Sequence, residues 1–357
     1  MPTEHGKFCP PPSFSEAVDQ WSVWLEQIKG RSPLTVDKYR RHLLQLEAYA
    51  RESDQDPWNL DLEDIELFVV MVARELGMTA RSRRPVTAAI RGFFKWASRK
   101  GLVASSPAEH LQYPSTGRRV PRPADLKTAE RLVMEPDINT FIGLRDAAMM
   151  MMMIGCGVRV SGLVRMNRNH LTWMDIDGHE RLAVMINEKG NNERLQPVPI
   201  ESAVLLRAYL ASPELAEIDT ELDDGDHVLW VSTNCRTIPA ADYHGEARRI
   251  STRTVHDMLQ RYGARAGLPL EQCHPHALRH LYATELAEEE IDLLQRQTLM
   301  GHSDPKSTEI YTHVAVRRLV KSVDKGNPLT KMQAGVVRDA RQLANKIQAR
   351  SRAPAGA

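Results

Sequence analysis

A proline-rich basic segment divides this chain into two regions, and no other feature of the sequence constrains the fold as strongly. Prolines at positions 107, 114, 121 and 123 alternate with arginines at 118, 119 and 122. Proline lacks the backbone donor that helices and sheets need, so such a segment is typical of a linker. The 357 residues also exceed what one ordinary hydrophobic core can organise. The sequence therefore predicts two domains with a boundary near residue 122.

Apolar residues before the linker recur with the three-four spacing of amphipathic helices. The spacing predicts four helices, at 14–29, from Pro33 to at least Tyr49, at 61–76 and at 85–100. The last helix surrounds its apolar stripe with arginine and lysine. We therefore expect a small helical module that lays a basic face on a nucleic-acid duplex.

The region beyond the linker combines helices with a small sheet. Helices are predicted at 124–134, 138–154, 201–211, 251–266, 275–289 and 292–300. Three short segments with apolar alternation lie at 170–176, 181–187 and 194–200, and are bounded by the turn signals Asp-Gly at 177–178 and Lys-Gly-Asn-Asn at 189–192. The predicted fold class is mainly α with a small antiparallel β-sheet.

Positive charge is concentrated in two windows, although the net charge is only +1. Residues 79–122 hold 10 Lys and Arg against one acid, and residues 314–357 hold 10 against two, so the local charges are +9 and +8. Clustered positive charge indicates a polyanionic partner. Solvated helix faces would also explain either window alone. Residues 214–226 hold seven acids and no base, and are expected to form an exposed loop.

Composition and motifs argue against several other classes of protein. Cysteines at 9, 156, 235 and 273 show no C-x-x-C spacing, which disfavours a disulfide framework or a zinc knuckle. The longest apolar run, 147–154, is much shorter than the roughly 20 residues of a membrane helix. The amino terminus lacks the apolar stretch of a signal peptide, so a cytoplasmic, nucleoid-associated protein is expected. The glycine-rich stretch at 155–163 lacks the third glycine of a nucleotide loop, and no cofactor is predicted.

A helix predicted to begin at Pro275 presents His276, Arg279 and His280 on one face, because these positions are three and four residues apart. Histidines four residues apart also occur in zinc proteases. Ala277 stands where those enzymes have their catalytic glutamate, so no metal site is predicted. His280 alone is better explained by a structural role.

Four further residues complete a constellation suited to phosphodiester cleavage. Arg159 is expected to extend from a helix start after a tight glycine turn, where its planar fork can bind two phosphate oxygens. Lys189 lies at a hairpin tip and can protonate a leaving oxygen. His302 and Tyr311 follow, and the phenol can attack to form a covalent phosphotyrosine. Each residue alone has an ordinary explanation, such as solvation or packing, so the combination carries the prediction.

The combination resembles the tyrosine recombinase, or phage integrase, family. The resemblance is carried by Gly-Val-Arg-Val-Ser, the hairpin lysine, His-Ala-Leu-Arg-His, Met-Gly-His-Ser and Ile-Tyr-Thr-His, in family order over residues 130–313. It implies a two-domain architecture, namely a disordered N-terminus (1–13), a helical, SAM-like core-binding domain (14–113), a basic linker (114–123), an α+β catalytic domain (124–322) and a basic tail (323–357).

The resemblance also implies a role for each catalytic candidate. Tyr311 would attack the scissile phosphate, giving a 3′-phosphotyrosine and a free 5′-hydroxyl. The other implied roles are phosphate binding by Arg159, Arg279 and His302, general acid catalysis by Lys189 and assistance to proton transfer by His276. Neither a metal ion nor a nucleotide is implied.

The implied partner is double-stranded DNA with specific recombination sites, held in a C-shaped clamp. A homotetramer would act on two such sites, with accessory proteins as further candidates and no membrane partner. Residues expected to contact DNA are Arg81, Arg83, Arg84, Arg91, Lys95, Arg99, Arg118, Arg119 and Arg122. Apolar residues at 336–347 have helical spacing, so the tail could dock on a neighbouring protomer or on DNA. A solvated tail is the alternative.

Gly162 departs from the family pattern, which has an acidic residue at this position. Either catalysis is weakened or another carboxylate, such as Glu188, substitutes. Three functions stay open, namely a site-specific recombinase of a mobile element or phage acting in integration, excision or resolution, a catalytically weakened DNA-binding member of the fold, and a relaxing topoisomerase. Retention of the six catalytic positions and the multi-helix amino-terminal module favour the first.

Overall fold

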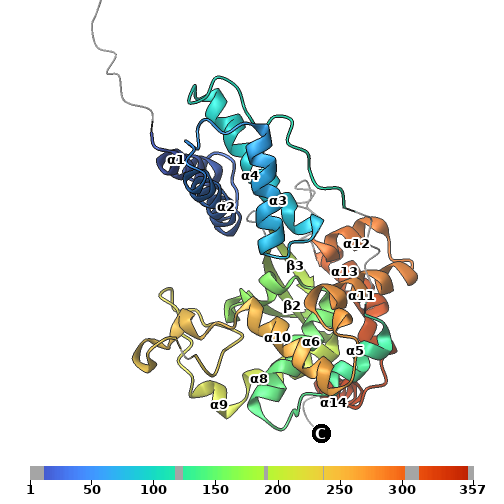
Figure 1. The fold of residues 1–357 in the computed structure, drawn as a ribbon. Coiled ribbons are helices and arrows are strands. Elements are labelled where there is room, and N and C mark those ends of the chain that lie inside the picture. Colours follow the sequence, from blue (N-terminus) through green and yellow to red (C-terminus); the bar gives the residue numbers. More distant parts are fainter. Residues whose placement is uncertain (1–11, 117–123, 189–191, 236, 302–312, 353–357) are drawn as a thin grey trace, which may run out of the picture. The chain divides into compact units, whose positions relative to one another are not determined.

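The structure is a computed structural model that describes residues 12–116, 124–188, 192–235, 237–301 and 313–352. They form two compact units that divide between positions 120 and 121 (Figure 1). The predicted boundary near residue 122 falls outside the described residues. Helices dominate, and a three-stranded antiparallel sheet accompanies them, which confirms the predicted fold class.

The described part of the amino-terminal unit contains α1 (Phe14–Gln27), α2 (Pro33–Glu52), α3 (Leu62–Glu75) and α4 (Ala80–Arg99). Capping boxes at Ser13 and Asp61 satisfy the first backbone donors of α1 and α3. Aromatic side chains fill the core, where the ring centroids of Phe14 and Phe93 are 5.0 Å apart in an edge-to-face arrangement. The predicted four-helix module is confirmed, because the apolar stripes of these helices share one core.

α4 begins earlier than its sequence predicted. The prediction placed the start at residue 85, because proline favours the first helical turn. The helix begins at Ala80, since the Thr79 hydroxyl accepts the backbone N–H of Ser82 at 3.2 Å. Pro85 lies inside the helix, so α4 tolerates one missing backbone hydrogen bond near its amino end.

The second unit is built around a central buried helix. In chain order its described elements are α5 (Leu126–Val133), α6 (Phe141–Cys156), α7 (Val160–Val164), η1 (Arg168–His170), β1 (Leu171–Ile176), β2 (His179–Glu188), β3 (Asn192–Pro197), α8 (Ile200–Leu210), α9 (Pro213–Ala216), η2 (Ala240–Asp242), η3 (Gly245–Arg248), α10 (Thr252–Arg265), η4 (Leu270–Gln272), α11 (Pro275–Glu288), α12 (Leu293–Met300), α13 (His313–Gly326), η6 (Pro328–Lys331) and α14 (Gly335–Arg352). The five methionines Met149–Met153 of α6 are all fully buried, as expected for a core helix. Among the described helices, none is both long and apolar enough to cross a membrane.

The sheet has the order β1-β2-β3, with both pairs antiparallel. Asp177 and Gly178 join β1 to β2 with positive φ angles of 58° and 76°, which is the geometry of a tight hairpin turn. The third strand was predicted at 194–200 but spans Asn192–Pro197. It ends early because Pro197 and Pro199 have no backbone N–H to donate to a neighbouring strand. Pro199 is also the N-cap residue of α8.

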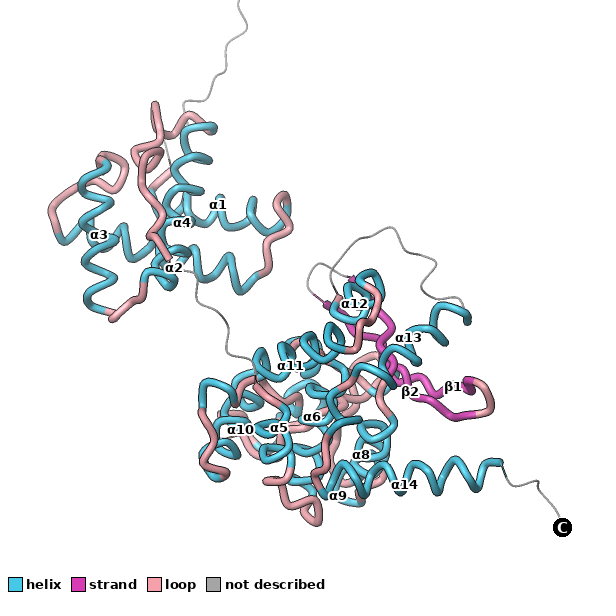
Figure 2. The backbone as a smooth tube through the Cα atoms, turned by 90° about the vertical axis from the view of Figure 1, so that its right-hand side faces the viewer, coloured by secondary structure: helices cyan, strands magenta, loops and turns pink. Residues whose placement is uncertain are grey.

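The carboxyl-terminal helices complete the core of the same unit (Figure 2). Val337 and Ala340 of α14 are buried, and Arg341 forms an ion pair with the buried Glu201 of α8 at 2.8 Å. Leu329 of η6 is fully buried against the α6 backbone at Gly155. The apolar face of α14 is therefore covered by its own chain, an arrangement that neither alternative for the tail had included.

Candidate active site

Arg159 stands at the start of a short helix that follows a tight turn. α6 is capped by Gly157, whose φ of 56° is left-handed, and Arg159 is the N-cap residue of α7. A Cβ atom at position 157 would lie 2.2 Å from Cδ1 of Tyr282, so the close approach also requires glycine. Nη1 of Arg159 donates to the backbone carbonyl of Gly301 at 3.5 Å. The glycine turn thus places Arg159 at a helix start, as the sequence predicted.

Arg279 projects from α11 into the same region. Its side chain is buried and donates to the backbone carbonyls of Gly157 and Met300. Because Arg159 donates to the neighbouring carbonyl of Gly301, both arginines are hydrogen-bonded to the carboxyl end of α12. The structure therefore brings together two predicted catalytic residues that are 120 positions apart in the chain.

A third guanidinium, that of Arg194, adds positive charge to this region. Burial lowers the pKa of Arg279 to about 9, and the charges of Arg159 and Arg194 act in the same direction. Burial also lowers the pKa of Arg159, and it lowers the pKa of Arg194 to about 10. All three groups remain protonated at neutral pH. A partly buried excess of positive charge favours binding of an anion such as a phosphodiester.

Arg194 was not among the predicted site residues, although it lies in the segment predicted as the third strand. In the structure Arg194 and Gln196 share the buried face of β3, and Nη1 of Arg194 donates to the Gln196 side chain. Arg194 and Gln196 are two residues apart in a strand, so their side chains point to the same face. This spacing could have indicated a polar site in the sequence.

His276 lies in the first turn of α11 and is exposed. Burial lowers the pKa of His276, and the positive charges of His280, Arg279 and Arg159 lower it further. The imidazole is therefore neutral at pH 7 and can accept a proton. His274 is the N-cap residue of α11, and its Nδ1 accepts a hydrogen bond from the backbone N–H of Ala277 at 3.1 Å. His280 is exposed on the same helix.

Several predicted residues lie outside the described residues, namely Lys189, His302 and Tyr311 of the catalytic set and Arg118, Arg119 and Arg122 of the DNA-binding set. Their chain neighbours are described. β2 ends one residue before Lys189, and α13 begins two residues after Tyr311. The carbonyls that Arg159 and Arg279 bind belong to the two residues directly before His302.

Gly162, the position at which the family has an acid, is buried in α7. The carboxylate suggested as its substitute, that of Glu188, lies outside what the structure describes. The charged groups that lower the pKa of Arg279 are both guanidinium groups, those of Arg159 and Arg194. The described part of the site is thus electropositive.

The basic residues of α4 divide into two groups. Arg84 and Arg91 both stack on the ring of Tyr113, at 5.1 and 5.4 Å from its centroid. They also donate to the backbone carbonyls of Pro114, at 3.2 Å, and Leu111. These two arginines therefore fasten the segment that follows α4. Arg84 is nevertheless exposed, as are the predicted DNA-binding residues Arg81, Lys95 and Arg99 of this helix, whereas Arg83 and Arg91 are half-buried.

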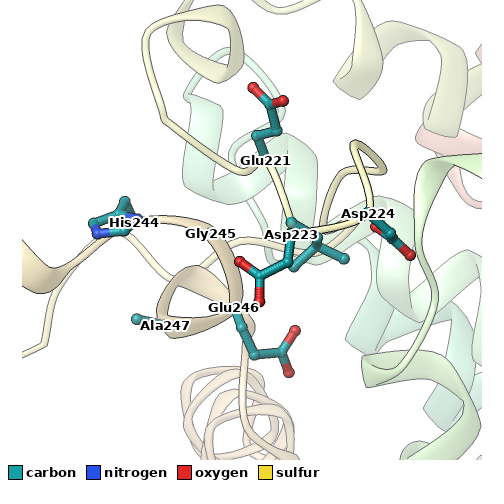
Figure 3. A pocket seen from close by; sticks show the side chains of 8 residues that line it. Glu221, Asp223, Asp224, His244, Gly245, Glu246 and Ala247 are labelled. Atoms are coloured by element: carbon teal, nitrogen blue, oxygen red, sulfur yellow. The ribbon is translucent and has the colours of Figure 1, made fainter.

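The acidic loop forms a pocket of its own, with a volume of about 510 Å³. Glu221, Asp223 and Asp224 line it together with His244 and Glu246 (Figure 3). This loop was predicted to be exposed, and most of its residues are. Its charge is opposite to that of the arginine cluster, so it is unsuited to a phosphodiester.

Comparison with known proteins agrees with the geometry. Residues 125–318 match the Phage integrase family, and residues 18–101 match its N-terminal SAM-like domain. The chain therefore belongs to the phage integrase family of tyrosine recombinases. It is a DNA-binding enzyme of site-specific recombination.

Relatives with similar sequences extend over almost the whole chain. Tyrosine recombinase XerD of Ralstonia nicotianae is 33% identical over 317 residues, which cover 87% of this chain and 93% of the relative. Tyrosine recombinase XerC of Yersinia pestis is 30% identical over 320 residues, covering 89% and 97%.

Two solved structures share the fold. XerH recombinase bound to a palindromic difH substrate has a TM-score of 0.58 at 18% identity, covering 86% of this chain and 83% of that chain. A lambda integrase dimer, residues 75–356, bound to a COC′ core site has a TM-score of 0.57 at 16% identity, covering 83% and 97%.

Proposed function

We propose that this enzyme cleaves and rejoins DNA through a 3′-phosphotyrosine formed at Tyr311, without a metal ion. The observation that carries the proposal is the convergence of Arg159 and Arg279 on the carbonyls at the end of α12. Guanidinium groups bind two phosphate oxygens at once and keep their charge at any physiological pH. They supply the fixed positive charge that a pentacovalent phosphorane needs, which in other nucleases a metal ion provides.

The proposed reaction begins when the phenolic oxygen of Tyr311 attacks the scissile phosphorus. The bond to the 5′ oxygen breaks, and Lys189 protonates this leaving group. Neutral His276 accepts the proton that the phenol of Tyr311 loses on attack, a role that its lowered pKa supports. His302 donates a hydrogen bond to a non-bridging oxygen. Rejoining reverses these steps, with a 5′-hydroxyl as the nucleophile, and no bond energy is lost to water.

The two units have distinct roles in this proposal. Residues 14–113 form the core-binding domain, and a basic linker at 114–123 leads from it to the catalytic domain. The catalytic domain extends beyond residue 322, because η6 and α14 share its core. Exposed Arg81, Lys95 and Arg99 bind phosphates of a duplex recombination site. Arg84 and Arg91 act differently, by fixing the segment that leads to the linker.

The proposed assembly is a homotetramer on two recombination sites. A solved relative of the same fold, at TM-score 0.57 and 17% identity, is a lambda integrase tetramer bound to a Holliday junction. The reaction would serve integration, excision or resolution for a mobile element or phage, with accessory proteins as further partners.

Gly162 supports a second candidate, a DNA-binding member of the fold with weakened turnover. An acid at this position would contribute a negative charge within α7, which carries Arg159 at its start. Its loss leaves the arginine cluster more positive, which favours DNA binding and slows release of the phosphate. Binding without cleavage is the result that this candidate predicts.

A suicide DNA substrate separates the two candidates. A nick close to the cleavage point lets the cleaved fragment diffuse away, so a covalent protein–DNA adduct accumulates and is counted on a denaturing gel. We expect an adduct with the full chain and none with Tyr311→Phe. Tyr113→Phe is the matched control, because it removes the same hydroxyl from a tyrosine of the other unit that is 43% exposed. An adduct that persists in Tyr311→Phe would refute the proposed nucleophile.

A further inference from the structure

Arg249 lies between η3 and α10, and its guanidinium group forms hydrogen bonds with all five of its N–H donors. Nε and Nη2 each donate to the carboxylate of Glu246 at 2.7 Å. Nη1 donates to the backbone carbonyls of Val164 and Met166 at 3.0 and 3.2 Å. Nη2 also donates to Oδ1 of Asn167 at 2.7 Å. The guanidinium is therefore committed to contacts within the protein rather than to a DNA phosphate.

The main chain at Arg249 is anchored in the core of the second unit. Arg249 forms an antiparallel bridge with Val231, and the N–H of Ile250 donates to the carbonyl of Trp230 at 3.0 Å. Trp230, Val231 and Ile250 are all buried. The side chain of Arg249 is itself only 14% exposed. The guanidinium thus acts from a fixed and largely enclosed position.

α7, whose end Arg249 binds, is too short to hold its own direction. Its five residues make about one and a half turns, and helices of this length are unstable in isolation. The last carbonyls of a helix have no donor within the helix. Val164 is the last residue of α7, and both Val164 and Met166 are buried. Loss of the Arg249 donors would remove hydrogen bonds from two carbonyls in the interior, so this end of the helix would shift.

Arg159 stands at the other end of the same helix. It is the N-cap residue of α7 and precedes Val164 by five positions, which corresponds to about 7.5 Å of helix. The turn at Gly157 fixes where α7 begins, and Arg249 fixes where it ends. A change in the direction of α7 therefore moves Arg159. Its planar fork binds two phosphate oxygens only in the correct orientation.

We infer that Arg249 is a positioning residue, which orients Arg159 towards the scissile phosphate by holding the carboxyl end of α7. The inference rests on the proposed phosphate-binding function of Arg159. Glu246, which lines the acidic pocket in Figure 3, orients Arg249 in turn by accepting two of its five hydrogen bonds. Arg249 itself does not touch the DNA in this role.

The test compares rates of adduct formation on the suicide substrate for full-length variants. Arg249→Gln should slow adduct formation by about 10- to 100-fold, as for a displacement of about 1 Å. Arg249→Lys should react at an intermediate rate, because lysine keeps the charge but has fewer donors and no planar fork. The control is Arg207→Gln, since Arg207 forms an ion pair with Glu180 at 2.6 Å elsewhere in the same unit. The control should react within about twofold of wild type, because exposed ion pairs contribute little.

The variant Arg159→Lys distinguishes an effect exerted through Arg159 from a general loss of structure. Lysine is a point charge with rotatable donors, so its contact with a phosphate depends less on the direction of α7. Arg249→Gln should therefore slow the Arg159→Lys enzyme by less than about threefold. If Arg249 only stabilised the fold, its loss would slow both enzymes by the same factor.

DNA affinity distinguishes positioning from a direct contact with DNA. In a gel-shift assay, Arg249→Gln should change the affinity of the enzyme for its duplex by less than about threefold, because Arg249 donates only within the protein. An unchanged affinity also shows that the variant is folded.

Three results would overturn the inference, namely a wild-type rate for Arg249→Gln, equal loss factors in the two Arg159 backgrounds, or a loss of DNA affinity as large as the loss of rate. None of them bears on Tyr311. Failure of the wild-type enzyme itself to form any adduct would instead refute the proposed function.

Discussion

Replacing Gly157 by alanine tests the packing that holds Arg159 and Arg279, the two arginines proposed to be catalytic, close together. The new methyl group would lie 2.2 Å from Cδ1 and 2.8 Å from Cγ of Tyr282, whose side chain is fully buried. Arg279 donates to the carbonyl of the same glycine. Tyr282 cannot move aside without disturbing α11, the helix that also carries this arginine.

The expected cost has two parts. A left-handed φ costs an alanine about 1–2 kcal/mol relative to glycine, and forcing a methyl group into a filled core costs about 1–3 kcal/mol more. Gly267 provides the control, because its φ is 61° and a Cβ atom there would meet no atom within 4 Å. Gly267→Ala should therefore show only the conformational part, and Gly157→Ala should exceed it by about 1–3 kcal/mol.

Hydrogen exchange read by mass spectrometry measures these costs locally. Peptides from α6 and α11 report the opening free energy around Gly157, and peptides from α10 report that around Gly267. Adduct formation on the suicide substrate, measured on the same samples, should fall in Gly157→Ala and stay unchanged in Gly267→Ala. Equal opening free energies and equal rates for the two variants would refute the packing argument.

Three further predictions concern the site and its support. Arg279→Lys should lower adduct formation by about 100-fold or more, because lysine offers no planar fork for two oxygens; a lysine enzyme of near wild-type rate would show that charge alone suffices. The pKa of His276 lies below its ordinary value of 6.5, so the neutral imidazole persists as pH falls. The decrease of the wild-type rate at acid pH should therefore occur below pH 6.5, and it should be absent in His276→Gln. The same decrease in that variant would show that His276 is not the titrating group. Leu329→Ala should lower the free energy of unfolding of the second unit, measured in urea, by about 2–5 kcal/mol, because it leaves a cavity beside α6. A change below about 1 kcal/mol would show that neighbouring side chains fill the cavity.

Local patterns in the sequence predicted the elements whose boundaries depend on local chemistry. Pro275 marked the start of α11, and Asp-Gly at 177 and 178 marked the β1–β2 turn. The glycine turn before Arg159 was predictable because left-handed backbone is a property of the residue itself. These features require no knowledge of the rest of the fold.

Long-range packing decided what the sequence did not show. Arg194 is buried because the face of β3 that carries it lies against the core, and alternation alone cannot say which face that is. The spacing in α14 indicated an apolar face, but the partner of that face, α8, lies more than a hundred residues away in the chain. The start of α4 was missed because the Thr79 cap outweighed the proline signal.

The place of α14 in the core bears on how the enzyme is made. Val337 and Ala340 leave the ribosome after every other described helix of the second unit, yet they belong to the same hydrophobic cluster as α6. At translation rates of about 5–20 residues per second, a nascent chain spends seconds with this cluster unfinished. We expect the second unit to become active only once α14 has packed against α8 and this core is complete.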